Sequence, residues 1–342
     1  MAISSVRFID PRHGTHDPTS GTPARLPGSV RRTTTTDSLR PHGFRGLTLA
    51  GRGRDLLTRP DGSAEVLATA MTEVEIEYAE GPVVRAVRAE PPADGLDSLV
   101  GRIASTGFRA VIDGAVSVPP GSLVYLLLDE IPACTLVSGY AVSQAVARGA
   151  LDQAGMTGLR PPGPVLQVAD LCSGWRAGGT IMTELEQTAR APVVTGPEAL
   201  ALDDPGDPLA WHAAPGLGAD EMRRARRHDL WRDGDGLLHA DILFRDSHVD
   251  GEGLETVVHE YAVEAVLSPD AATVVSCRAT PRVLPWQECP EAAASAARLA
   301  GMEIGGLRKR VRAEFVGPST CTHLNDTLRE IDDAAALAAL LP

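Results

Sequence analysis

The stretch RRARRHDLWRDGDGLLHADILFRDSH, residues 223–248, decides the fold of the chain. The turn residues Asp233, Gly234, Asp235 and Gly236 lie between an arginine-rich segment and a run in which apolar and polar residues alternate. Asp-Gly pairs favour tight hairpin turns, and alternation with a period of two is typical of a half-buried strand. The stretch therefore predicts a hairpin turn followed by a strand at the start of the second half of the chain.

Working outward, two further strands are predicted at residues 255–268 and 273–284, after which Pro285 ends the sheet. An alanine-rich helix is predicted at residues 290–301, because proline lies near its start and glycine at its end. One or two more helices are predicted from Leu324 onward. Strands followed by helices predict an α+β fold.

The first half carries a similar, less regular pattern. Residues 31–91 are rich in threonine, arginine and alternating apolar residues, which predicts two or more antiparallel strands. Residues 96–109 have the apolar spacing of an amphipathic helix, and residues 137–160 also look helical. The apolar segment 122–131 fits a helix or a strand equally well, because periodicity alone does not separate the two.

The two halves resemble each other. Residues 99–131 align with 299–331 without a gap and share seven identical positions, and RRTTTTD at 31–37 matches RRARRHD at 223–229. This predicts an internal duplication, in which each half is an antiparallel sheet followed by helices and the halves pack as a pseudo-dimer. The predicted organisation is a flexible lead-in at 1–30, a diverged first repeat at 31–155, a Gly/Pro-rich connection at 156–219 and a second repeat at 220–342.

The composition of the 342-residue chain limits the partners and the cellular location that are expected for it. No run approaches the ~18 apolar residues of a membrane span. The net charge of -13 argues against a nucleic-acid partner. An N-terminus without a long apolar segment, together with five scattered cysteines, predicts a reducing, cytoplasmic location.

The densest group of reactive residues begins with Cys321, His323 and Asp326. At the aligned positions the first half has glycine and leucines, so the sequence predicts a site in the second half only. The preceding turn, residues 317–320, places Cys321 at a helix N-terminus, where backbone amides stabilise a thiolate. The group could bind a metal or hold a nucleophile beside a base, and the alternative is a helix cap with a buried cysteine.

His259 and Tyr261 lie in a predicted strand, which rules out a helical zinc-protease motif. Alternate residues of a strand share one face, so this His and Tyr are candidates for an acid-base pair, with ordinary cross-strand packing as the alternative. Arg245 is a candidate for binding a substrate carboxylate, and a structural Arg-Asp pair explains it equally well. Trp286 is either a pocket wall or a core anchor.

The sequence contains no phosphate loop, dinucleotide fingerprint or serine-hydrolase elbow, so no organic cofactor is expected. The residue types suited to zinc or iron in the second half are Cys289, Cys321 and His323. They lack the paired spacing that makes a metal site recognisable from sequence.

Residues 222–331 resemble the DUF2889 family. The features that carry the resemblance are the arginine run, His259-Glu260 within a strand, a junction with Pro285 and Cys289, and the late motif Cys321-Thr322-His323-Leu324. The family motif has glycine before the cysteine, where this chain has Thr320. The resemblance implies a fold rather than a reaction.

Taken together, these patterns predict an enzyme of small-molecule catabolism, a lyase, isomerase or hydrolase. Its site would contain His259, Tyr261, Arg245, Cys321 and His323, and Arg245 would suit an anionic substrate. A non-catalytic binding or assembly module that uses the sheet as a platform is the alternative. A third hypothesis places an anionic ligand on the arginine run 223–227.

Overall fold

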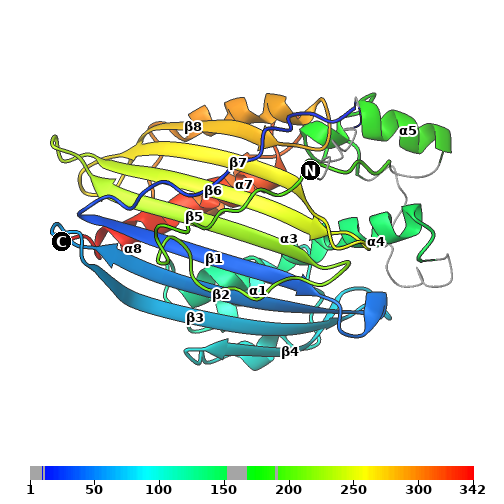
Figure 1. Cartoon of the computed structure of the whole chain (residues 1–342), viewed down its shortest axis with the longest axis horizontal. Coiled ribbons are helices and arrows are strands. Elements are labelled where there is room, and N and C mark those ends of the chain that lie inside the picture. The colour runs from blue at the N-terminus through cyan, green and yellow to red at the C-terminus, as the bar shows by residue number, and fades with distance from the viewer. Residues whose placement is uncertain (1–9, 11, 152–167, 189–191) are drawn as a thin grey trace, which may run out of the picture.

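One antiparallel sheet of eight strands forms the centre of the molecule (Figure 1). The computed structural model describes residues 10, 12–151, 168–188 and 192–342. The strand order is β4-β3-β2-β1-β5-β6-β7-β8, so each half of the chain supplies four neighbouring strands. The strands are β1 (Ser29–Leu39), β2 (Gly46–Thr58), β3 (Ala64–Glu77), β4 (Val83–Glu90), β5 (Met222–Arg232), β6 (Leu238–Val249), β7 (Glu255–Leu267) and β8 (Val274–Val283).

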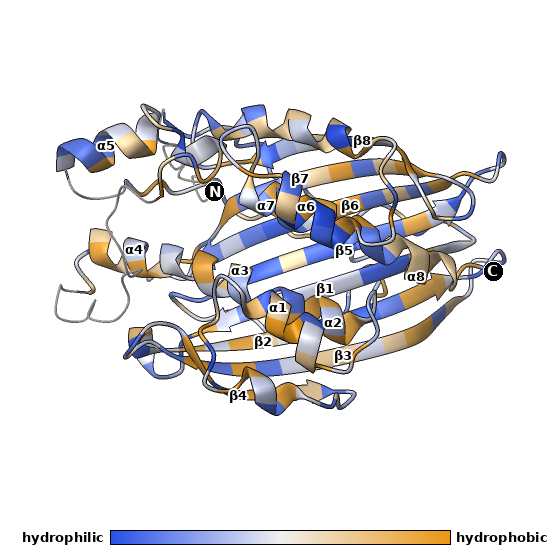
Figure 2. Ribbon diagram, turned by 180° about the vertical axis from the view of Figure 1, so that it is seen from behind, coloured by the Kyte–Doolittle hydropathy of each residue, from blue (hydrophilic) through white to orange (hydrophobic). Residues whose placement is uncertain are grey.

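Helices cover one face of this sheet, as Figure 2 shows from behind. Together with the sheet they confirm the predicted α+β class. The α-helices are α1 (Phe108–Ala115), α2 (Leu123–Asp129), α3 (Ile131–Val137), α4 (Gly139–Ala147), α5 (Thr180–Thr188), α6 (Leu307–Glu314), α7 (Thr322–Glu330) and α8 (Ala334–Ala338). Short 3-10 helices are η1 (Gly43–Arg45), η2 (Leu96–Leu99), η4 (Ser173–Trp175), η5 (Cys289–Leu299) and η6 (Ile331–Asp333).

The strands predicted for the second half are confirmed as β6, β7 and β8. The Asp233 side chain accepts hydrogen bonds from the backbone N–H groups of Asp235 and Leu237, at 2.9 and 3.0 Å, and so forms the predicted turn. The arginine run is itself a strand, β5, in the middle of the sheet. The ambiguous segment 122–131 is helical and contains α2.

The helix predicted at residues 96–109 is wrong. A 3-10 turn ends at Leu99, and α1 begins only at Phe108. Gly101 and Gly107 between them have φ values of 78° and 89°, which a continuous right-handed helix does not allow. The predicted helix at 290–301 is the 3-10 helix η5. Of the helix predicted at 137–160, α4 covers residues 139–147, residues 148–151 are not helical, and residues 152–160 lie outside the described part.

The two halves are joined through β1 and β5 by a reciprocal pair of ion pairs. Arg31 Nε and Nη2 contact the Asp229 carboxylate at 2.6 and 2.8 Å. Arg223 Nε and Nη2 contact Asp37 at 2.7 and 2.9 Å. The halves therefore share one continuous sheet. A common origin of the two halves stays a prediction.

Extended segments from both ends of the first half cross the other face of the sheet (Figure 1). Within the predicted lead-in, the backbone N–H of Gly14 donates to Leu284 O at 3.0 Å, and that of Thr19 donates to the Glu260 carboxylate at 2.7 Å. Within the predicted connection, Leu209 O accepts from Arg54 at 2.6 Å. The described parts of both segments are therefore fixed against the sheet, and the connection also contains α5.

A layer of buried charges separates two large apolar clusters, one built mainly by each half. Arg226 of β5 contacts Glu130 Oε1 through Nε at 2.7 Å and Glu330 Oε2 through Nη1 at 3.0 Å. Burial raises the pKa of Glu330 to about 7 despite this contact. Buried charges persist in a protein interior when they are paired and hydrogen-bonded, as these are. The layer contains Arg32, Arg224, Arg226, Arg308, Arg329, Asp55, Asp129, Glu130, Asp246, Asp326, Glu330 and Asp333.

The arginine run is thus part of the interior. Arg224, Arg226 and Arg227 are buried, and Arg223 pairs with Asp37. All four guanidinium groups contact carboxylates of the same chain. The run does not form a free cationic surface of the kind that an anionic ligand would need.

Helix α2 is rich in apolar residues and is buried along its whole length. In the part of the chain that the structure describes, no single helix combines the length and the apolar composition of a membrane span. The bent pair of segments 123–129 and 131–147 meets those criteria only when taken together.

Replacing Arg226 with alanine should destabilise the fold strongly. The change leaves Glu130 and Glu330 buried without their shared guanidinium, and loss of one partner from a buried ion pair costs about 3–5 kcal/mol. Urea unfolding should therefore give a free energy of unfolding that is lower by roughly this amount. Arg278→Ala, which removes an exposed pair with Glu264, is the control and should change little. Equal effects of the two substitutions would contradict the buried network's role.

Candidate functional site

The register of β6 and β7 brings together an acid and a base that are distant in sequence. Asp246 of β6 is the direct cross-strand partner of His259 on β7. His259 and Tyr261 both face the helices, as the alternation of a strand predicts, because each contacts a residue of the segment that starts α7. The candidate site therefore lies between β6, β7 and the N-terminal end of α7.

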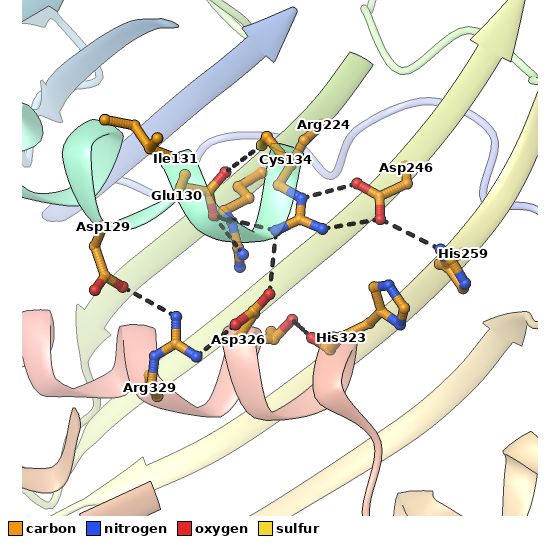
Figure 3. Close-up of polar contacts among 12 residues, drawn as sticks. Asp129, Glu130, Ile131, Cys134, Arg224, Asp246, His259, His323, Asp326 and Arg329 are labelled. Atoms are coloured by element: carbon orange, nitrogen blue, oxygen red, sulfur yellow. Dashed lines mark hydrogen bonds and ion pairs between the residues drawn. The ribbon is translucent and has the colours of Figure 1, made fainter. Parts of the chain in front are cut away.

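Two histidines stack at this boundary (Figure 3). The rings of His259 and His323 have centroids 3.6 Å apart and an interplanar angle of 20°. Asp246 Oδ2 lies 3.3 Å from His259 Nδ1 on the side of the sheet. The His259 side chain is 13% exposed and Asp246 is only 2% exposed, so the carboxylate lies behind the ring and solvent reaches the imidazole.

Arg224 positions this group. Its Nε and Nη2 contact the two Asp246 oxygens at 2.8 and 3.0 Å, and its Nη1 contacts Asp326 Oδ2 of α7 at 3.2 Å. The guanidinium carbon also lies 4.8 Å from the centre of the Phe244 ring. One buried side chain therefore ties β6 to α7, and α7 carries His323 over His259.

The electrostatics of the site give its members opposite protonation preferences. Burial alone would raise the pKa of Asp246, but Arg224 and the nearby imidazole of His259 hold it well below its ordinary value. Burial, together with the neighbouring His259, lowers the pKa of His323 to about 3. Near neutral pH, Asp246 is a carboxylate and His323 is a neutral imidazole.

The same three residues are the only ones, in the described ranges, whose metal-ligand atoms all lie within 4.8 Å of one another. Two features disfavour a metal at this point. The lone pairs of the stacked rings lie in two nearly parallel planes and so converge poorly on one ion, and Arg224 already contacts both oxygens of Asp246. The arrangement suits proton transfer better than metal binding.

Cys321 is the N-cap residue of α7, as predicted, and its Sγ lies 3.8 Å from His323 Nδ1. Burial raises the pKa of its thiol to about 12, although the backbone N–H groups of Leu324 and His323 act in the predicted, lowering direction. A nucleophilic role for this cysteine stays a prediction. The hydroxyl of Tyr261 faces the same thiol, and burial raises its pKa well above the ordinary value. Both groups are therefore fully protonated near neutral pH, and both are buried.

Arg245 is not brought to the histidines. It lies next to Asp246 on β6, so its side chain faces the opposite side of the sheet. There its guanidinium contacts Glu260 at 2.6 Å, Leu200 O at 2.6 Å and Thr19 O at 2.5 Å. The geometry thus shows Arg245 in a structural ion pair with a carboxylate, which was the alternative to substrate binding. Trp286 is buried in the apolar cluster of the second half, as a core anchor, and the predicted metal ligand Cys289 is buried in the same cluster.

The sequence placed Asp246 only in a structural pair with Arg245, and Arg224 only in the arginine run of the anionic-ligand hypothesis, so it did not predict that either belongs to the histidine site. Asp246 is adjacent to Arg245, the residue that the sequence analysis proposed for the site. Because side chains of a strand alternate, only one of these two neighbours can face His259 and Tyr261. The register between β6 and β7 decides that the one is Asp246. For Arg224 the sequence carries no signal beyond its place in an arginine run.

The most evident surface hollows lie elsewhere. One is lined by α5 residues together with Gly178, Gly179 and Glu288. The other is lined by residues of η5 together with Arg176, Pro318 and Ser319. Neither hollow includes His259 or His323 in its lining, so the histidine pair does not form part of either.

The lowered pKa of His323 predicts acid sensitivity. Between pH 6.5 and about 3 the unfolded chain binds a proton at this residue that the folded chain does not. The stability that the neutral ring contributes is complete above the unfolded value and is lost as the pH falls. Urea unfolding at about pH 5 should give a free energy lower than at about pH 7, by up to about 2 kcal/mol from this residue.

His323→Gln removes this titration and should reduce the difference between the two pH values. Other histidines with lowered pKa, such as the fully buried His228, keep part of the acid sensitivity in the variant. An unchanged pH dependence in His323→Gln would show that this imidazole is not held neutral by the fold.

Comparisons with known proteins agree with this picture and add no activity. No curated protein and no solved structure matches the chain. One family model matches, described as "Protein of unknown function (DUF2889)", and the matched segment runs from the start of β5 into α8. It contains Asp246, His259 and His323. Residues 222–337, about a third of the chain, thus match the DUF2889 family that the sequence motifs indicated.

Proposed function

We propose that the protein is an enzyme that transfers a proton to or from a small molecule, as lyases, isomerases and hydrolases do. The observation that carries the proposal is the stacked pair His259 and His323, in which one imidazole is backed by a buried carboxylate. Histidine is the residue most often used for general acid-base catalysis, since its proton exchanges near neutral pH.

Asp246 is the positioning residue of the proposed site. As a carboxylate 3.3 Å from His259 Nδ1 it favours a proton on that nitrogen, which leaves the lone pair of the neutral ring on Nε2. His323 supplies a second neutral imidazole at a ring distance of 3.6 Å. Because two cations this close repel each other, one imidazole stays neutral when the other takes up a proton. The pair therefore offers one acid and one base in a single protonated state.

The covering of the sheet supports catalysis over the alternative of a binding platform. In the described part of the chain, helices cover one face, and the segments 13–28 and 192–220 cross the other (Figures 1 and 2). The edge strand β4 carries Arg85 and Arg88, exposed and paired with glutamates of β3. Charged residues on an edge discourage strand addition, so neither the covered faces nor the β4 edge favours the platform.

The surroundings of the histidines limit the chemical class of substrate that the proposed site could bind. Arg224, which acts on His323, is paired with carboxylates, and Arg245 lies on the other face. The proposed substrate is therefore a small molecule recognised by its shape and its acidic C–H or ester bond rather than by an anionic group. A cytoplasmic setting is part of the proposal, because all five cysteines are free thiols.

Proton exchange tests the proposal. The purified protein is incubated in deuterated water with panels of small uncharged carbonyl compounds and esters, and NMR follows loss of C–H signals and new products. His259→Asn and His323→Asn should each reduce the exchange or turnover by at least about 100-fold, the usual contribution of a general base.

His239→Asn is the matched control. This histidine also pairs with an aspartate, at 2.7 Å from Asp233, but it lies in the β5–β6 hairpin. The control variant should keep the activity of the wild type. Turnover that survives both His259→Asn and His323→Asn would overturn the proposed site, and the absence of any exchange across the panels would count against the enzyme.

A further inference from the structure

We propose that Glu330, the last residue of α7, and His228 of β5 form a buried proton-binding pair, and that the bound proton holds this end of α7 against the sheet. The pair lies near the opposite end of α7 from His323, so the proposal goes beyond the proposed function and does not depend on it. Both side chains are at most 1% exposed, which places the proton in the interior of the protein.

Three buried polar atoms meet here without hydrogen-bond partners among the described residues. They are Nδ1 and Nε2 of His228 and Oε1 of Glu330. The other oxygen of Glu330, Oε2, accepts from Arg226 Nη1 at 3.0 Å. A neutral imidazole carries one N–H donor and one lone pair, so His228 leaves a donor and an acceptor unused. An unused buried polar group destabilises the fold, and a proton shared with Glu330 would satisfy two of the three atoms.

The distance between the two groups fits a shared proton better than a bridging water. His228 Nδ1 lies 3.8 Å from Glu330 Oε1. A water that bonds to both atoms at its tetrahedral angle would need them roughly 4.5 Å apart, because each bond is about 2.8 Å long. A direct O–H···N bond of about 2.8 Å requires only a shift of about 1 Å in the Glu330 side chain.

The charges around the pair leave carboxylates in excess. Among the described residues, the buried layer defined above contains five arginines and seven carboxylates, and Arg109 and Asp332 at its edge add one charge of each sign. Glu330 is the one carboxylate of this layer with a buried oxygen that has no hydrogen-bond partner. An interior relieves surplus negative charge by taking up a proton, so Glu330 is the group at which the layer would bind one.

Electrostatics place the proton on Glu330. Burial raises the pKa of Glu330 to about 7, and the nearby carboxylates act in the same direction. Burial lowers the pKa of His228 to about 3, and a neighbouring guanidinium acts in the same direction. The hydroxyl of protonated Glu330 therefore donates to the lone pair on His228 Nδ1. The charged groups that act on Glu330 are Arg226 of β5, Arg32 of β1, Glu130 between α2 and α3, and Asp333 of η6.

Loss of the proton weakens this contact. The pKa of Glu330 is raised above its ordinary value of 4.5, so between the two values the folded chain holds a proton there that the unfolded chain releases. The stability that the pair contributes is complete below the ordinary value and is lost as the pH rises through about 7. The direction is opposite to that of His323, whose contribution is lost as the pH falls. Alkaline conditions should therefore loosen the end of α7.

NMR measures the proton on the wild-type chain. With glutamate labelled with carbon-13 at the side-chain carboxyl, a single glutamate resonance should titrate with a midpoint near pH 7, and this resonance should be absent from Glu330→Gln. If no glutamate carboxyl titrates above about pH 6, well beyond the ordinary range, the proposal is wrong.

The imidazole of His228 provides a second signal. Its Nδ1 resonance, followed by nitrogen-15 NMR, should move with the same midpoint as the Glu330 carboxyl while the ring itself stays neutral. Midpoints that differ by more than about one pH unit, beyond the spread expected for a coupled pair, would show that the two groups do not share a proton.

Stability gives an independent measure. Glutamine is the uncharged isostere of protonated glutamic acid, so Glu330→Gln should fold and should lose the pH dependence of this residue. Measured by urea unfolding, the unfolding equilibrium constant of the wild type relative to that of the variant should rise about 10-fold between about pH 6 and pH 8. The ratio cancels the histidines and cysteines, which titrate alike in both chains.

Glu288→Gln is the matched control. Glu288 also has a buried oxygen without a partner, but its carboxylate accepts from the N–H and the hydroxyl of Thr180 at 2.7 and 2.8 Å. Despite burial, these hydrogen bonds lower its pKa. The corresponding ratio for this variant should stay constant from pH 6 to pH 8. A ratio for Glu330→Gln that is equally constant would contradict the proton-binding pair.

Hydrogen exchange tests the hold on α7. In the wild type, the protection factors of the amides in the last turn of α7 should fall about 10-fold between about pH 6 and pH 8, in step with the loss of the proton. In Glu330→Gln they should stay nearly constant. Protection of the wild type that does not change with pH would overturn the part of the proposal that concerns α7.

Discussion

The contact between Arg224 and Asp246 is the constraint on which the rest of the second half depends. It joins neighbouring strands in the middle of the sheet and, through Asp326, holds α7 against that sheet. Because both charges are buried, neither can be left without the other at small cost. The position of α7, and hence of His323 and Cys321 at its start, follows from this one guanidinium.

The buried charges are not confined to one pair. Arg226 joins the junction after α2 to the end of α7, and Arg308 of α6 contacts both Asp129 and Asp333. The helices of the two halves are therefore held to the sheet, and to each other, by ion pairs between the two apolar clusters. Ion pairs have fixed partners and directions, whereas apolar contacts do not, and this arrangement specifies how the halves meet.

The start of α7 carries the proposed site. His323 in its first turn stacks on His259, and Cys321, its N-cap, lies beside Tyr261. The His259 side chain is partly open to solvent, while the Cys321 thiol is buried. This difference in exposure is a physical reason to assign proton transfer to the histidine pair.

The sequence by itself determined the α+β class, the hairpin turn at Asp233, the strands β6 to β8 and the family resemblance of residues 222–337. It also placed His259 and Tyr261 on one face, because turn chemistry and strand alternation are local properties. Only the tertiary structure decided that Asp246, and not Arg245, joins them, since this depends on the register of β6 against β7. Likewise, the approach of Glu330 to His228 results from the packing of α7 on the sheet. Neither contact can be predicted from sequence spacing. His228 and Glu330 are separated by more than a hundred positions, and Asp246 and His259 lie on different strands.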